Sequence, residues 1–140
     1  MLDTLRKRLR SEKGFTLIEL LVVMIILAIL MAVAIPSYLS FRDRANKSAA
    51  GADLRAAIPS VEAYFSDHGT YNGMTVPILQ ASYDQSISSG IITLGSTLTA
   101  TTYCVQATSP SDSDKIAVKN GPNQQIVVGT VSSGTPTPCA

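Results

Sequence analysis

The sequence has very few of the side chains from which catalytic and metal-binding sites are built. Its 140 residues include one histidine, His68, and two cysteines, Cys104 and Cys139. It contains no glycine-rich phosphate loop, no paired metal-ligand motif and no nucleophile placed beside a base in a known motif. These absences predict that the protein is not an enzyme, requires no cofactor and binds no metal.

Charge is also almost absent from residues 15–35. No residue from Leu20 to Ile35 is charged, and Glu19 is the only charged residue from Phe15 to Ile35. As a helix, Phe15–Ile35 would be roughly 31 Å long, close to the hydrocarbon thickness of a bilayer. A carboxylate inside such a segment costs at least about 2.5 kcal/mol, so Glu19 is a candidate functional residue.

A basic segment precedes the apolar one. Residues 1–14 carry five basic and two acidic side chains, a net charge of +3; the whole chain carries +1, so residues 15–140 carry −2. Positive charge before a first membrane segment is typical of the cytoplasmic side, which predicts a cytoplasmic N-terminus and an external C-terminal part. The mildly acidic remainder offers no electrostatic argument for nucleic-acid binding, and contact with nucleic acid stays open.

The junction Gly14-Phe15-Thr16-Leu17-Ile18-Glu19 resembles the cleavage and methylation motif of type IV prepilins and of type II secretion pseudopilins. Further along, Glu62–Tyr71 resembles the end of the long pilin helix and the turn after it. The resemblance implies cleavage after Gly14 by a prepilin peptidase and methylation of the new amine of Phe15. It also implies a single-pass protein of the cytoplasmic membrane that enters a homopolymeric surface filament, helped by an assembly platform and a motor ATPase.

Cleavage would supply Glu19 with a partner of opposite charge. The new ammonium on Phe15 would lie about one helical turn away in the same chain, and an axial stagger would set it against the Glu19 of a neighbouring subunit. Either pairing relieves the cost of unpaired charges in an apolar medium, and the intermolecular one also fixes register. The resemblance implies the same role, so Phe15 and Glu19 are the predicted assembly residues.

Other interpretations stay open. A conventional signal peptide would also have a basic leader and an apolar run, and Ala32-Val33-Ala34 resembles its cleavage site; the product would be a secreted or membrane-anchored binding module. The length of the run, the presence of Glu19 and the helical pattern beyond Pro36 argue against it. Within the family, the alternatives are a type II secretion pseudopilin and a DNA-uptake pilus subunit, with functions in motility, adhesion, secretion or DNA uptake.

One long helix is predicted from Phe15 to about Asp67. Residues 15–36 are apolar all round, as expected of a transmembrane or filament-core helix, whereas residues 37–67 are amphipathic. We expect a kink at Pro36. Pro59 is expected either to kink the helix, which we favour, or to end one helix and stand in the first turn of another. A stripe of small and aromatic residues at helical spacing is predicted to pack on a sheet. The stripe consists of Tyr38, Phe41, Ala45, Ala49, Ala52, Ala56 and Ala63.

The remaining residues, 68–140, are predicted to form a globular β-rich region after the leader (1–14) and the two helix parts (15–36 and 37–67). We expect a short helix at Val76–Ala81 and a turn at Ser109–Asp114. Short β-branched runs predict the strands: Ile91–Leu94, Thr101–Thr108, Lys115–Lys119 and Gln125–Val131. The predicted fold is therefore α+β, a long helix packed on a small antiparallel sheet.

The β-rich region also contains both cysteines and a pair of closely spaced aspartates. A disulfide between Cys104 and Cys139 would suit an exported domain and hold down the tail Ser132–Pro138, and C-terminal disulfide loops are a feature of the family that the sequence resembles. Asp112 and Asp114 resemble part of the calcium loop of major pseudopilins. Two carboxylates supply too few oxygens for calcium, so we expect a solvated turn and no metal.

Overall fold

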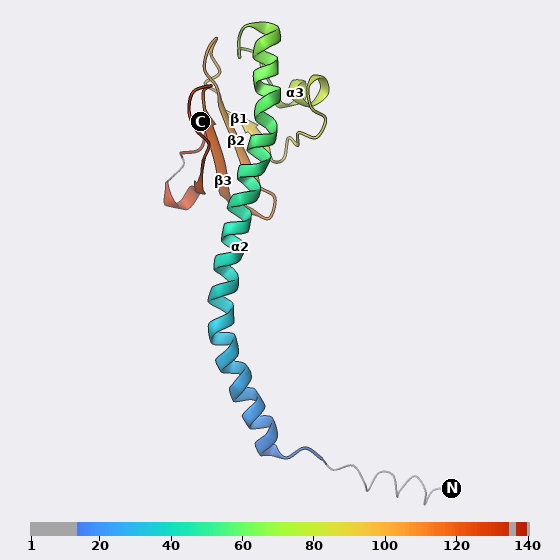
Figure 1. The fold of residues 1–140 in the computed structure, drawn as a ribbon, viewed down its shortest axis with the longest axis vertical. Helices are drawn as coiled ribbons and strands as arrows, with labels where there is room; N and C mark the ends of the chain where they lie inside the picture. Colours follow the sequence, from blue (N-terminus) through green and yellow to red (C-terminus); the bar gives the residue numbers. More distant parts are fainter. Residues whose placement is uncertain (1–13, 135–136, 140) are drawn as a thin grey trace, which may run out of the picture. The chain divides into compact units, whose positions relative to one another are not determined.

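The computed structural model of the chain describes residues 14–134 and 137–139. Of the predicted leader, only Gly14 lies within the described residues. The elements in chain order are α2 (Leu17–His68), α3 (Val76–Ser82), β1 (Ile92–Leu94), β2 (Cys104–Ser109), β3 (Asp112–Asn120), β4 (Val127–Thr130) and the 3-10 helix η1 (Val131–Ser133) (Figure 1). The predicted α+β fold is confirmed.

The chain divides into two compact units, with the boundary between Leu39 and Ser40. We call the described part of the first unit, residues 14–39, the N-terminal segment, and the second unit, residues 40–140, the head. Helix α2 belongs to both, and it is unbroken at Pro36 and Pro59. Pro59 is exposed, which is where a helix tolerates proline, because water can satisfy the carbonyl that the missing N–H leaves unpaired. Pro59 therefore does not split the helix. The kinks at Pro36 and Pro59 stay predictions.

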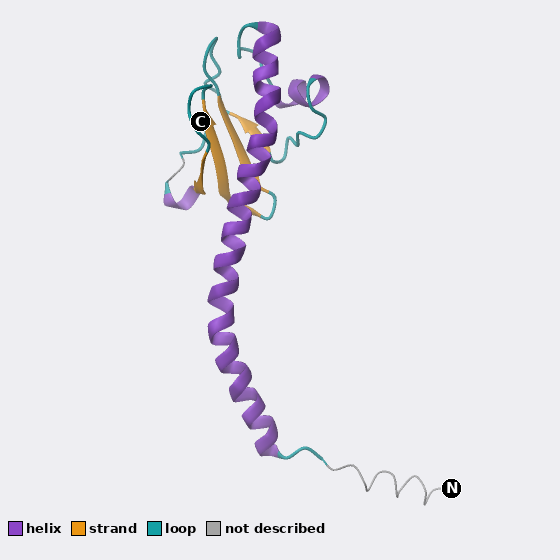
Figure 2. Ribbon diagram, in the orientation of Figure 1, coloured by secondary structure: helices purple, strands orange, loops and turns teal. Residues whose placement is uncertain are grey.

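The sheet of the head is a four-stranded antiparallel meander in the order β1-β2-β3-β4 (Figure 2). All four strands were predicted, although their ends differ. The turn expected over Ser109–Asp114 is present but shorter than predicted, because Ser109 already pairs with Asp112 and only Pro110 and Ser111 connect β2 to β3. Polar residues suggested a turn here, but backbone pairing with the neighbouring strand extends β3 through them.

The helix face that packs on the sheet is not the predicted alanine stripe. Tyr38, Phe41, Ala45, Ala52 and Ala56 are exposed. The buried residues of α2 are Asn46, Ala50, Gly51, Leu54, Ala57, Ser60, Val61 and Tyr64. This face carries Leu54, Val61 and Tyr64, and burying them removes more apolar surface from water than burying the neighbouring alanines would. Spacing alone did not distinguish the two faces, because both repeat at helical intervals.

One glycine on that face sets how closely the sheet approaches the helix. A Cβ on Gly51 would lie 3.2 Å from Val128 Cγ2 in β4 and 3.3 Å from Arg55 Nη1. Real Cβ atoms rarely approach other atoms so closely, so a larger residue here would push β4 or the Arg55 side chain aside. Gly51 therefore lets the edge strand and the Arg55 guanidinium pack against the same turn of α2.

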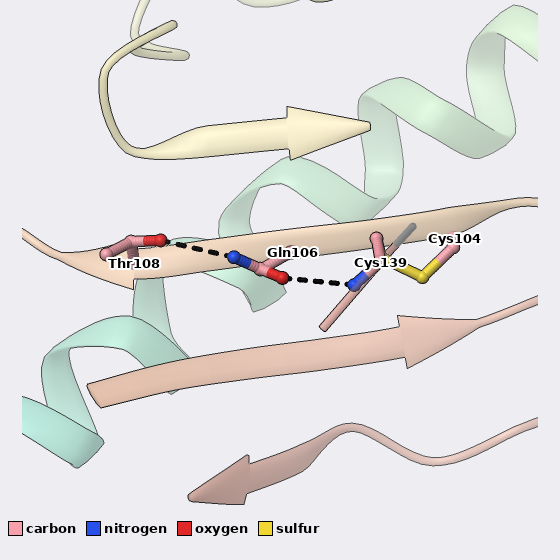
Figure 3. Close-up of a disulfide and its surroundings, with 4 residues drawn as sticks. All are labelled: Cys104, Gln106, Thr108 and Cys139. Carbon is pink, nitrogen blue, oxygen red and sulfur yellow. Dashed lines mark hydrogen bonds between the residues drawn. A yellow bond between two sulfur atoms is a disulfide. The ribbon is translucent and has the colours of Figure 1, made fainter. Parts of the chain in front are cut away.

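The opposite face of the sheet is covered by the C-terminal segment. A disulfide joins Cys104 in β2 to Cys139 (Figure 3). The backbone N–H of Cys139 donates to Gln106 Oε1 at 3.1 Å. Cys104 and Cys139 form a small apolar cluster with Ile116 and Val118 of β3. The sheet thus lies between α2 on one face and the residues around Cys139 on the other.

Candidate functional site

The predicted processing and assembly residues gather at the start of α2. Gly14 and Phe15 are exposed, and a Cβ on Gly14 would meet no atom within 4 Å. The Glu19 carboxylate turns back toward the helix start, where its Oε2 accepts hydrogen bonds from the backbone N–H and the hydroxyl of Thr16, both at 2.8 Å. The Glu19 N–H in turn donates to Thr16 Oγ1 at 3.3 Å.

This reciprocal arrangement is a capping box, with Thr16 as the N-cap and Glu19 three residues later. It satisfies backbone donors that the first helical turn leaves unpaired. No role was predicted for Thr16, although the spacing Thr16-x-x-Glu19 before an apolar run is a sequence signal for a capping box. Glu19 therefore has polar partners even in the chain that still carries residues 1–14.

The rest of the N-terminal segment offers apolar surface in every direction. Every residue from Gly14 to Leu39 is exposed within the described chain. The large exposed side chains include Leu20, Ile25, Leu30 and Ile35. Helix α2 is long and apolar enough to cross a membrane by length and composition. A soluble monomer rarely exposes so large an apolar surface, so this segment requires cover from lipid or from other chains.

At the far end of α2, one carboxylate joins three parts of the head. Glu62 accepts a hydrogen bond from the Tyr71 hydroxyl at 2.9 Å through Oε2, and from the Tyr103 hydroxyl at 2.8 Å through Oε1. The two tyrosine rings meet edge to face, and Phe65 stacks on Tyr71. Burial, reinforced by the bond to Glu62, raises the pKa of Tyr71 to about 12, and the same causes raise the pKa of Tyr103. Both hydroxyls therefore stay protonated as donors.

We expect Glu62→Ala to destabilise the head by about 3 kcal/mol. Tyr71 and Tyr103 are 1% and 2% exposed, and each buried hydroxyl left without an acceptor costs about 1–3 kcal/mol. Chemical unfolding of the detergent-solubilised chain, followed by near-UV circular dichroism, measures the loss. Glu62→Gln keeps one carbonyl acceptor and should lose less. Equal stability of Glu62→Ala and wild type would show that the two hydroxyls find water instead.

A second charged cluster joins α2 to the other end of the sheet. Lys115 of β3 is 8% exposed, and its Nζ lies 3.7 Å from Asp43 Oδ1, 3.7 Å from Asp112 Oδ2 and 3.5 Å from Asp114 Oδ2. Burial lowers the pKa of Lys115, but the three carboxylates outweigh it and hold the pKa above its usual value. The N–H and hydroxyl of Ser132 donate to Asp114 and hold the pKa of that carboxyl below its usual range.

The ammonium of Lys115 thus occupies the centre of the carboxylate group that includes Asp112 and Asp114. Among residues 14–134 and 137–139, no group of three or more His, Cys, Asp or Glu side chains has the geometry to hold a metal ion. His68, the last residue of α2, stacks on Tyr64, and its Nδ1 lies 3.0 Å from the Tyr64 carbonyl oxygen. The cluster around Lys115 thus joins α2 to β3, whereas the contacts of His68 stay within the last turn of α2.

Comparison with known proteins agrees with the N-terminal geometry. The family described as "Prokaryotic N-terminal methylation motif" matches residues 9–35. The chain is 36% identical over 99 residues to the type IV wide pilus major component PilA4 of Thermus thermophilus, covering 71% of this chain and 75% of that protein. No solved structure gave a significant match.

Two other relatives match over shorter lengths. The chain is 40% identical over 61 residues to the type IV major pilin protein PilA of Myxococcus xanthus, covering 44% of this chain and 28% of that protein. It is 39% identical over 62 residues to the type II secretion system core protein G of Pseudomonas aeruginosa, covering 44% of each. The match to the Thermus protein is therefore the one of these three that takes in more than half of the chain.

Proposed function

The chain belongs to the type IV pilin family, and on that basis we propose that it is a structural subunit of a type IV pilus-like filament. It is cut after Gly14, methylated on the Phe15 amine, held in the cytoplasmic membrane by residues 15–36, and polymerised through the same helix. The observation that carries the proposal is the N-terminal segment, which combines the matched methylation motif with an apolar helix that is exposed throughout. The function is assembly rather than catalysis.

The topology and partners follow from the charges and from the motif. The five basic residues of the leader place the N-terminus in the cytoplasm and the head outside, where the Cys104–Cys139 disulfide is stable. A prepilin peptidase removes the leader, and a platform with a motor ATPase drives polymerisation. The filament is a helical assembly of copies of this chain, because stacked N-terminal segments bury one another's apolar surface.

A type II secretion pseudopilin is the second candidate. The similarity to core protein G favours it, because that match has nearly the same identity as the match to the Myxococcus pilin. It covers less of this chain, however, than the match to the Thermus pilus component, 44% against 71%. We therefore place the pilus subunit first.

The intact mass and N-terminal sequence of protein sheared from cells test the processing step. We expect a chain that begins at N-methylated Phe15, with the mass of a disulfide-bonded form, because the exposed Gly14–Phe15 bond lies inside the matched motif. Gly14→Val is the control: it should keep residues 1–14, stay in the membrane fraction and leave the sheared fraction empty. A wild-type chain that begins at Ile35 would instead establish a signal peptide.

A further inference from the structure

Two grooves of opposite charge lie on the head, apart from the charged clusters around Glu62 and Lys115. The first groove has a volume of about 400 Å³ and lies beside the residues that lead into the edge strand β4. Its lining includes the cationic side chains of Arg55 and Lys119, together with Gln124, Gln125 and Ile126. Within the described residues no carboxylate lines this groove or forms a salt bridge with Arg55 or Lys119. We call it the basic groove.

The charge of Lys119 is poorly compensated inside its own chain. The residue is 9% exposed, and its Nζ donates to two backbone carbonyls, Pro122 O at 3.1 Å and Gln124 O at 2.5 Å. Neutral carbonyls hold the ammonium in place and leave it one further proton to donate. A buried charge of this kind is stabilised by a partner of opposite sign, so the basic groove favours an incoming carboxylate.

The second groove lies beside β1 and carries the opposite charge. It has a volume of about 280 Å³ and is lined by Asp53 and Asp84 with Ala57, Ile87 and Ile92, and no cationic residue lines it. Asp84 accepts hydrogen bonds from the Ser86 hydroxyl at 2.7 Å and the Ser86 N–H at 2.8 Å, which hold the pKa of its carboxyl below the usual range. This acidic groove therefore presents an ionised and oriented carboxylate.

The grooves lie on opposite sides of the head. Because β1 and β4 are the two edge strands, the acidic groove beside β1 and the basic groove beside the residues that lead into β4 flank opposite edges of the sheet. The helix gives the same result: Leu54 is fully buried against the sheet, and Asp53 and Arg55 diverge by about 100° to either side of it. One head therefore cannot bring its own two grooves together.

We propose that the face of the head around the basic groove of one subunit docks against the face around the acidic groove of the next, so that the cationic side chains of Arg55 and Lys119 meet the carboxylates of Asp53 and Asp84 across the contact between heads. The inference rests on the proposed function, because it takes a second copy of this chain as the occupant. Two different surfaces that complement each other make a heterologous contact, which generates an open helical polymer when the rotation does not close. Charge complementarity would also set which faces of neighbouring heads meet.

A charge swap in the full-length chain tests the contact. Arg55→Glu and Asp53→Lys, each alone, should lower the amount of sheared filament at least about tenfold, because like charges then face each other between heads. The double variant Arg55→Glu/Asp53→Lys restores complementarity and should return filament yield to within about twofold of wild type. Residues two apart on a helix do not face each other, so this rescue cannot arise within one chain.

Matched measurements separate the contact from folding and from the proposed function. Each variant must accumulate in the membrane with an intact disulfide, and Ser66→Glu/Gln80→Glu, which makes the same net charge change as Arg55→Glu at exposed sites outside both grooves, should assemble normally. Wild-type yield from both single variants, or a double variant no better than they are, would overturn the charge contact while leaving the filament function intact. A wild-type chain that never forms filaments would overturn both.

Discussion

Replacing Glu19 by alanine is expected to leave membrane insertion and cleavage unchanged and to reduce filament yield by about a hundredfold or more. In the proposed processing, cleavage after Gly14 would create an ammonium on Phe15 in a helix that is apolar on every side, where Glu19 is the only carboxylate. Removing one partner of an ion pair in an apolar medium costs about 3–5 kcal/mol, because the other charge is left uncompensated. Immunoblots of membrane and sheared fractions measure the effect.

The capping box makes a sharper test possible. Glu19→Gln keeps an oxygen that can accept from the N–H of Thr16 but removes the charge, whereas Thr16→Ala removes the side-chain cap and keeps the carboxylate. If charge pairing drives assembly, Glu19→Gln should fail like Glu19→Ala, and Thr16→Ala should still assemble, with a loss of about 1 kcal/mol in helix stability. Assembly by Glu19→Gln together with failure of Thr16→Ala would assign Glu19 to capping alone.

Removing the disulfide with Cys104→Ser/Cys139→Ser is expected to lower the stability of the head by about 4 kcal/mol. The bond joins residues 35 positions apart, and in the chain-entropy model a loop of that length constrains the unfolded state by about this amount. For a domain of this size the loss corresponds to a fall in melting temperature of roughly 15–30 °C. Thermal unfolding of the detergent-solubilised chain, followed by near-UV circular dichroism, measures it.

Removal of the disulfide should also destabilise the head locally, and two controls separate this loss from other effects of the substitutions. Releasing Cys139 uncovers Ile116 and Val118 on the outer face of the sheet, so the double serine variant and reduced wild-type protein should melt at the same low temperature. Thr137→Ala alters an exposed residue of the same tail and should melt like the oxidised wild type. A melting temperature that stays unchanged on reduction would show that the tail remains docked without its covalent bond.

Much of the fold follows from local patterns in the sequence. The extent of α2 was predictable because apolar periodicity and the absence of charge act within the helix itself, and all four strands were visible as short β-branched runs. The face of α2 that meets the sheet was not, because the alanine stripe and the stripe of Leu54, Val61 and Tyr64 have the same helical spacing. Only packing against the sheet distinguishes them.

The candidate site divides along the same line. The features of the N-terminal segment, from Gly14 to Glu19 and through the apolar run, could be read from the sequence because they are properties of one continuous stretch of chain. Its Thr16–Glu19 capping box is likewise a contact over three residues. Such features depend on residue order and on one helical turn, and neither requires the chain to fold back on itself.

Which distant residues meet in the head depends on the tertiary fold. Glu62 and Tyr103 are 41 positions apart, and Lys115 reaches Asp43 across the space between β3 and α2. The separation of Arg55 and Lys119 from Asp53 and Asp84 on opposite sheet edges also depends on strand order and on the face that α2 buries. These side chains come together only when burial of the shared core brings the helix and the sheet into contact. No local pattern in the sequence encodes such contacts.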